Sequence, residues 1–224
     1  MKLEVQIKMN ETLYVRDPEQ SELGKNIIKY SILLIQKKGF EVFTFKKLAE
    51  AIGTTEASIY RYFENKHKLL VYLISWYWGW LEFQIIYQTK NVQDSKAKLK
   101  QVITLLATTV QDDIMTSHVD ESLLNQILIS EGCKSYLTKH VQEDNKQEFF
   151  SPYKDLCKTV GEIILECNIQ YKYPQSLAST IIEVAHLQNF FLHNLPALTD
   201  FDQTKKEDQI IEFLNSLVFS SINN

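Results

Sequence analysis

The chain has 224 residues, of which 45% are hydrophobic, and a formal net charge of −4. This is enough apolar material for one large or two small domains, which argues against a disordered chain. Only 6 Gly and 4 Pro interrupt long helix-forming stretches, so we expect an all-α protein. Residues 1–70 carry 12 basic and 9 acidic side chains, a balance of +3, whereas residues 71–224 balance at −7. The N-terminal part is the part suited to an anionic partner.

The opening residues mix charged and apolar side chains, unlike a signal sequence, and no run of about 18 apolar residues occurs. We therefore expect a cytoplasmic protein without a membrane partner. The cysteines, Cys133, Cys157 and Cys167, are odd in number and lack CxxC spacing, and the histidines show no ligand spacing. No catalytic motif occurs either. We expect no metal, no cofactor and no enzymatic activity.

In chain order, residues 3–15 alternate apolar and polar side chains, which predicts a short hairpin or an extended arm over residues 1–20. From Ser21 the pattern becomes helical and stops at Gly39. Short helices are predicted at 45–52 and 56–62, and a long helix from Lys66 to Thr89 with Asn65 as its cap.

The remainder of the chain also predicts helices. Asp94 can cap a helix whose apolar stripe is Leu99, Val102, Leu106, Val110 and Ile114. Apolar stripes and prolines place others at about 123–128, 136–141, 174–195 and 206–221, with Pro152 interrupting 145–166.

The most informative stretch runs from Thr44 to Leu70. Ala49, Gly53 and Ile59 have the spacing of a helix-turn-helix: a small residue where helices cross, a glycine in the turn and an apolar anchor. If Ile59 faces inward, the polar side chains around it face outward. Thr44 and Thr55 precede the two short helices, where their hydroxyls can cap helix N-termini that suit phosphate.

At these residues the stretch resembles the TetR/AcrR family of bacterial regulators. The pattern is carried by Thr44, Ala49, Gly53, Tyr60-Arg61-Tyr62-Phe63, Lys66 and Leu69-Leu70, and the likeness covers about 23–75. The resemblance implies a three-helix DNA-binding domain at 21–68, behind the arm at 1–20. It also implies a larger helical domain at 69–224 for effector binding and dimerisation.

The resemblance further implies a ligand-responsive repressor that binds a pseudo-palindromic operator in double-stranded DNA as a homodimer. Phosphate contacts are then expected from Thr44, Tyr60, Tyr62 and Lys66, and base contacts from Lys46, Thr55, Glu56, Ala57, Ser58 and Arg61. Packing between helices is the alternative role for each tyrosine. A helical scaffold or adaptor, or an enzyme without a recognisable motif, remains the alternative function.

The predicted long helix has an aromatic face, which a core usually buries but which could instead line a cavity for a small apolar or aromatic effector. The candidate lining residues, including polar groups from elsewhere, are Trp76, Trp80, Phe83, Gln84, Tyr87, His118, Gln126 and Tyr153.

The last two predicted helices carry more apolar residues than one buried stripe needs, which predicts a dimer interface. Its candidate residues are Ile181, Val184, Phe190, Phe191, Phe213, Leu214 and Leu217. The alternative is that both helices are internal to one subunit.

Overall fold

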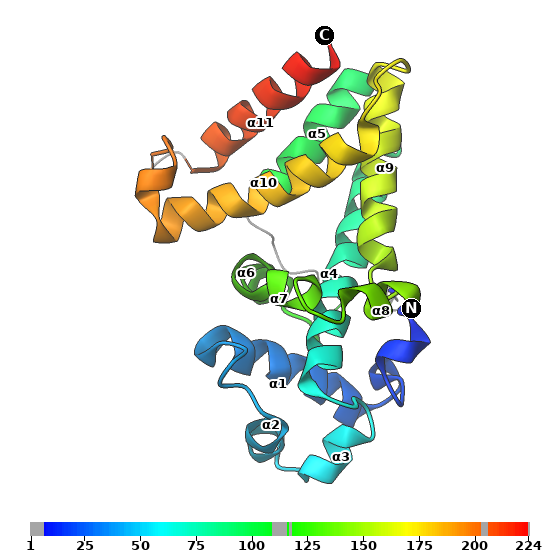
Figure 1. Cartoon of the computed structure of the whole chain (residues 1–224), viewed down its shortest axis with the longest axis vertical. Helices are drawn as coiled ribbons and strands as arrows, with labels where there is room; N and C mark the ends of the chain where they lie inside the picture. The colour runs from blue at the N-terminus through cyan, green and yellow to red at the C-terminus, as the bar shows by residue number, and fades with distance from the viewer. Residues whose placement is uncertain (1–6, 109–115, 117, 203–205, 224) are drawn as a thin grey trace. The chain divides into compact units, whose positions relative to one another are not determined.

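The computed structural model describes residues 7–108, 116, 118–202 and 206–223 (Figure 1). Over these residues the chain is helical and has no β-strand, which confirms the predicted all-α fold. Internal contacts divide the chain into two compact units. The first comprises Met1–Trp80 and Val110–Pro152, and the second Leu81–Thr109 and Tyr153–Asn224. The division falls inside one long helix, whereas the sequence suggested a boundary after residue 68.

The first unit begins with three helices that match the sequence prediction closely. They are α1 (Glu22–Lys38), α2 (Phe45–Ile52) and α3 (Glu56–Tyr60), followed by α4 (Lys66–Thr89), of which the part up to Trp80 belongs here. Each of these four helices is preceded by a residue whose side chain accepts a hydrogen bond from a backbone N–H in the first turn. This bond satisfies a donor that has no partner within the helix. These caps are Ser21, Thr44, Thr55 and Asn65.

Three further helices complete the first unit: α6 (Glu121–Glu131), α7 (Cys133–Tyr136) and α8 (Val141–Lys146). α6 lies against α1. Leu137 has φ −80° and ψ 58°, which is not a helical conformation, and it separates α7 from α8. The prediction of one helix across 136–141 is therefore wrong. Leu137 is 74% exposed, so no buried contact holds it in a helix.

The N-terminal segment forms turns in place of the predicted hairpin or extended arm. Its described part, residues 7–20, contains η1 (Glu11–Leu13) and η2 (Pro18–Gln20), while residues 1–6 lie outside the described residues. Asn10 and Asp17 each accept the N–H of the residue two positions later, at 2.9 Å. Such local bonds favour turns over a strand ladder, which is the physical reason for the difference.

The same segment packs against the rest of the first unit. Leu13 is fully buried. The backbone N–H of Val15 donates to the carbonyl of Tyr62 at 2.8 Å, and the Asn10 amide donates to the carbonyl of Gln147 at 2.7 Å. The segment is therefore tied to the end of the α3 region and to the end of the α8 region.

The second unit contains the end of α4 and four further helices. They are α5 (Ser95–Ala107), α9 (Ser151–Cys167), α10 (Pro174–Asn194) and α11 (Lys206–Ile222), with the short turn η4 (Pro196–Leu198) after α10. α10 and α11 pack against each other and against α5 (Figure 1).

The ends of these helices follow local rules. Asp94 caps α5 by accepting the N–H of Ala97 at 2.7 Å, as predicted. Val110 and Ile114, expected on the same stripe, lie outside the described residues. Pro152 does not interrupt a helix: it is the second residue of α9, where its missing N–H leaves no bond unmade.

α4 is long and apolar enough to cross a membrane by length and composition alone. However, 72% of its most apolar window is buried inside the fold, and every residue from Leu69 to Trp78 is buried. This burial is typical of the core helix of a soluble protein.

Candidate nucleic-acid interface

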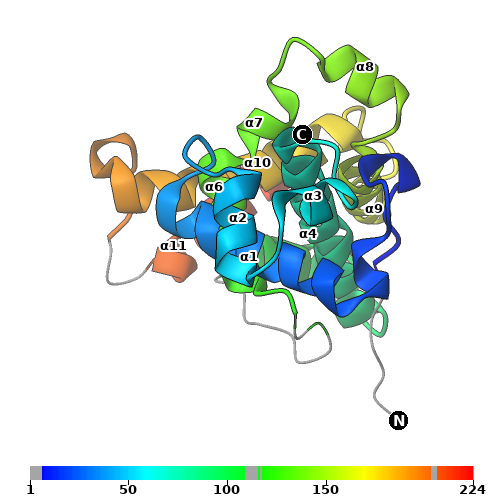
Figure 2. The ribbon, with the colours of Figure 1, turned by 90° about the horizontal axis from the view of Figure 1, so that it is seen from below.

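α2 and α3 lie side by side and are joined by a short turn (Figure 2). Gly53 occupies the left-handed region with φ 75° and ψ 37°, which a residue with a Cβ rarely adopts. The N–H groups of Gly53 and Thr54 both donate to the carbonyl of Ala49 at 3.0 Å. Ala49 and Ile59 are buried. The predicted helix-turn-helix is therefore present, with the small residue, the glycine and the anchor in their expected places.

The two short helices present capped N-termini. Thr44 Oγ1 accepts the N–H of Lys47 at 3.3 Å, and Thr55 Oγ1 accepts the N–H of Ser58 at 3.2 Å. Both threonines are exposed. A helix N-terminus combines free N–H groups with the positive end of the helix dipole, so both positions can receive an anionic oxygen.

Most of the predicted DNA contacts share this surface. Tyr60 is 50% exposed, and its ring meets the Phe45 ring at 5.0 Å in an edge-to-face contact. Ser58 is partly exposed and the other members are exposed. We call this set the α2–α3 surface; it comprises Thr44, Lys46, Thr55, Glu56, Ala57, Ser58, Tyr60 and Arg61.

Tyr62 lies elsewhere. It is only 3% exposed, and its hydroxyl is 2.8 Å from the hydroxyl of Ser21, the cap of α1. The tyrosine therefore joins α1 to the chain after α3, and this burial corrects its assignment as a phosphate contact. The alternative role, packing between helices, is the one that the structure supports.

Lys66 is also engaged inside the protein. Its ammonium donates to the carbonyls of Phe40, Glu41 and Phe43 at 3.1, 3.3 and 3.3 Å, and lies 4.6 Å from the centre of the Phe40 ring. A lysine ammonium has three N–H donors, and three carbonyls accept them here. Lys66 therefore holds the α1–α2 turn, and its contact with phosphate stays a prediction.

One exposed cation beside Tyr62 was not predicted. Arg16 is exposed, and its guanidinium lies 5.4 Å from the centre of the Tyr62 ring. The sequence held no signal for this placement, because Arg16 and Tyr62 are far apart in the chain and meet only after the N-terminal segment folds back.

The predicted effector residues divide between the two units. Trp76, Trp80, His118 and Gln126 belong to the first unit, and Phe83, Gln84, Tyr87 and Tyr153 to the second. Several of their polar groups already have partners, which are Glu19 for His118, Gln36 for Gln126 and Glu183 for Tyr153.

The aromatic side chains of this set differ in burial. Trp76 and Trp80 are only 2% and 6% exposed. Their side chains therefore belong to the core, as the aromatic face of a helix usually does. The Trp80 indole Nε1 has no acceptor among the described residues. Tyr87 is 69% exposed and stacks on Phe83 at 6.0 Å. Neither unit by itself gathers the whole set around one cavity.

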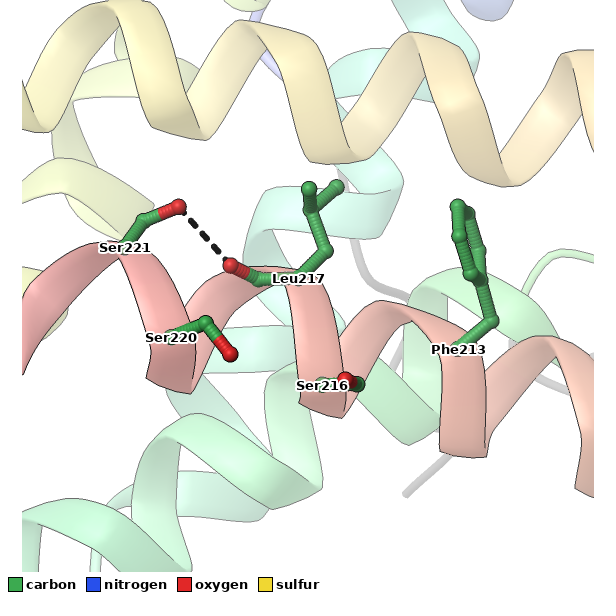
Figure 3. Close-up of a pocket in the computed structure, with 5 residues that line it drawn as sticks. All are labelled: Phe213, Ser216, Leu217, Ser220 and Ser221. Carbon is green, nitrogen blue, oxygen red and sulfur yellow. Dashed lines mark hydrogen bonds between the residues drawn. The ribbon is translucent and has the colours of Figure 1, made fainter.

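An open depression of about 320 Å³ lies on α11 in the second unit (Figure 3). Phe213 and Leu217 point to the same side of the helix, with Ser216 and Ser220 beside them. Phe213 is 40% exposed, and no lining residue is charged. The depression is therefore a neutral, partly apolar strip.

The predicted dimer residues separate into two groups. Ile181 and Leu214 are fully buried within the single chain, so they are core residues and their assignment to an interface is corrected. The others are partly or largely accessible: Val184, Phe190, Phe191, Phe213 and Leu217.

In the part of the chain that the structure describes, no three His, Cys, Asp or Glu side chains are grouped so that they could hold an ion. Cys133 is exposed, Cys157 is buried, and Cys167 donates to the carbonyl of Ser95 at 3.2 Å.

Comparison with known proteins agrees with this arrangement. Residues 27–73 match the family model of the bacterial regulatory proteins of the tetR family, a segment that runs from α1 through the helix-turn-helix into α4. No curated protein matches the chain.

Solved structures match over almost their whole length. The transcriptional regulator FadR from Bacillus subtilis, in complex with stearoyl-CoA, is 19% identical with a TM-score of 0.62, and the match covers 85% of this chain and 97% of FadR. AibR, in complex with isovaleryl coenzyme A and operator DNA, is 16% identical with a TM-score of 0.59, covering 88% and 99%. A TetR transcriptional regulator from Legionella pneumophila is 24% identical with a TM-score of 0.55, covering 90% and 98%. At these identities the likeness shows the shared fold.

Proposed function

We propose that this chain, which carries the tetR-family DNA-binding domain at residues 27–73 and the fold of TetR-family regulators, is a cytoplasmic transcriptional repressor. It binds a pseudo-palindromic operator as a homodimer. The α2–α3 surface is the observation that carries the proposal: two exposed, capped helix N-termini stand beside exposed basic and hydroxyl side chains.

The surface offers two kinds of contact. The N-termini at Thr44 and Thr55 and the hydroxyl of Tyr60 suit phosphate oxygens, which position a protein on duplex DNA without distinguishing sequences. Arg61 and Lys46 suit guanine edges in the major groove, and Glu56 and Ser58 can accept or donate at other bases. Ala57 offers a methyl group for contact with a thymine methyl.

The test begins with duplexes selected from a random pool by the wild-type protein. Arg61→Ala should weaken binding to the selected duplex by roughly 1–3 kcal/mol and relax preference at one position. Lys158→Ala, an exposed lysine on α9, should leave binding unchanged. Binding should also weaken steeply with salt, because phosphate contacts release counterions.

The result also separates the alternatives. A wild-type protein that retains no duplex even at low salt would refute DNA binding and would favour a helical scaffold or an enzyme. If Arg61→Ala weakened every sequence equally, the DNA-binding function would stand but Arg61 would contact phosphate.

We further propose that a small effector with an apolar portion releases the protein from DNA. AibR with isovaleryl coenzyme A and FadR with stearoyl-CoA, which share this fold, support an acyl-CoA as the class to test first. Isovaleryl-CoA and stearoyl-CoA should weaken operator binding, whereas free coenzyme A should not. By linkage, an active acyl-CoA must bind the free protein more tightly than the DNA complex by the same factor.

A further inference from the structure

The turn between α1 and α2, residues 39–43, is held by charged side chains from two other elements. This turn leads directly into Thr44, the cap of α2, so its position decides where the helix-turn-helix begins. One side chain comes from the start of α4 and the other from the end of α6. What these contacts do for DNA affinity rests on the proposed function.

Glu131, the last residue of α6, holds the N–H side of the turn. Its Oε1 accepts the backbone N–H of Phe40 at 3.0 Å, although the two residues are 91 positions apart. The carboxylate also lies over Gly39, where an added Cβ would stand 3.4 Å from Oε1. Only 12% of the Glu131 side chain is exposed, so the bond is largely shielded from water and is stronger than an exposed one.

Lys134, in α7, extends this contact to the next residue of the turn. Its ammonium lies 2.7 Å from Glu131 Oε2 and 2.9 Å from Glu41 Oε1. The two carboxylates raise the pKa of Lys134 above its usual value, Glu131 contributing most. The contact to Glu41 is highly exposed, since 76% of that side chain is accessible, so it adds little.

Lys66 contacts the carbonyl groups of the same turn, to which its ammonium donates three hydrogen bonds. A carboxylate thus faces a turn N–H while an ammonium faces the turn carbonyls. The negative charge of Glu131 meets an N–H donor, and the positive charge of Lys66 meets C=O acceptors. Both contacts therefore stabilise the same conformation of the turn.

We propose that Glu131 is a positioning residue for DNA binding, through which the end of α6 holds the α1–α2 turn and hence the α2–α3 surface. Without this bond the turn samples other conformations, and DNA then binds only the fraction of molecules in which the surface is formed.

The test compares Glu131→Ala with Glu131→Gln and with Glu143→Ala, which removes an exposed ion pair to Lys146 on α8. Glutamine keeps an oxygen that can accept the Phe40 N–H, whereas alanine does not. Glu131→Ala should accelerate amide hydrogen exchange at Phe40 and weaken binding to the selected duplex, each by roughly tenfold. Glu131→Gln should stay within about threefold of wild type in both measurements, and Glu143→Ala should match wild type.

Exchange in the buried part of α4, residues 69–78 of the same unit, serves as a check on folding and should not change in any variant. Unchanged Phe40 exchange and unchanged duplex affinity in Glu131→Ala would overturn the proposal, and so would equal losses in the alanine and glutamine variants. If the wild type bound no duplex, the proposed function would fail, and the Phe40 exchange would still report whether Glu131 holds the turn.

Discussion

Lys66 illustrates how a residue type that suits DNA can serve the fold. Its ammonium donates to three carbonyls of the α1–α2 turn. Lys66→Met keeps the apolar stem but removes these bonds, so we expect a loss of about 2 kcal/mol in the free energy of unfolding, measured in urea. Lys46→Met, at an exposed position on α2, should change stability by less than about 0.5 kcal/mol. A Lys66→Met protein as stable as the control, but defective in DNA binding, would support the phosphate role.

His186 gives the protein a pH dependence. It lies in α10 at 8% exposure, and burial lowers its pKa to about 4. The unfolded chain takes up a proton near pH 6.5, so between these values the unfolded state binds more protons. The stability that neutral His186 contributes is therefore complete above about pH 6.5 and is lost as pH falls toward 4.

Unfolding in urea at about pH 7.5 and pH 5 measures this effect. The wild type should lose about 2 kcal/mol more than His186→Gln on acidification, because the variant lacks the titrating group. His140→Gln, at an exposed position, should behave as wild type. Equal losses in the wild type and His186→Gln would show that other groups control acid stability.

At the scale of elements, close packing between α1 and the N-terminal segment depends on Gly24. A Cβ at Gly24 would collide with the backbone of Pro18, which η2 places against α1. Gly24→Ala should therefore release the segment and speed trypsin cleavage after Arg16 by roughly tenfold. Gly161→Ala is the matched control, because its added methyl comes closest to the flexible Gln175 side chain, at 3.2 Å, and makes only an ordinary contact with the Pro174 backbone, at 3.5 Å. Unchanged cleavage in Gly24→Ala would show that the segment adapts without leaving α1.

At the scale of the whole molecule, the accessible face of α11 is the surface that we propose for the homodimer. Ser216→Arg together with Ser220→Arg would place two charges on this neutral strip beside Phe213 and Leu217. Sedimentation at low micromolar concentration should then show a monomer of 26.2 kDa, with duplex binding weakened because two linked contacts become one.

Gln170→Arg, in an exposed loop of the same unit, should leave the assembly unchanged. A charge at Leu214 does not test the interface, because that side chain is fully buried and its replacement is expected to unfold the unit. A serine double variant that sediments as the wild type does would place the dimer elsewhere or exclude it.

The sequence by itself determined the features that depend on near neighbours in the chain. Thr44, Thr55 and Asp94 could be identified as caps because each bonds an N–H three residues away. Gly53 marked the helix-turn-helix because its backbone conformation excludes most other residues. The members of the α2–α3 surface lie next to these local signals in the chain, so all of them could be predicted from the sequence.

The tertiary structure decided everything that depends on distant residues. Whether Lys66 faces phosphate or the α1–α2 turn, and whether Leu214 faces a partner or its own core, depends on which element arrives beside it. Glu131 left no signal in the sequence, since its partner lies 91 positions away. Amphipathic spacing predicts that a helix face is buried, but it does not predict which element covers that face. The same apolar stripe is compatible with an internal helix and with a subunit interface.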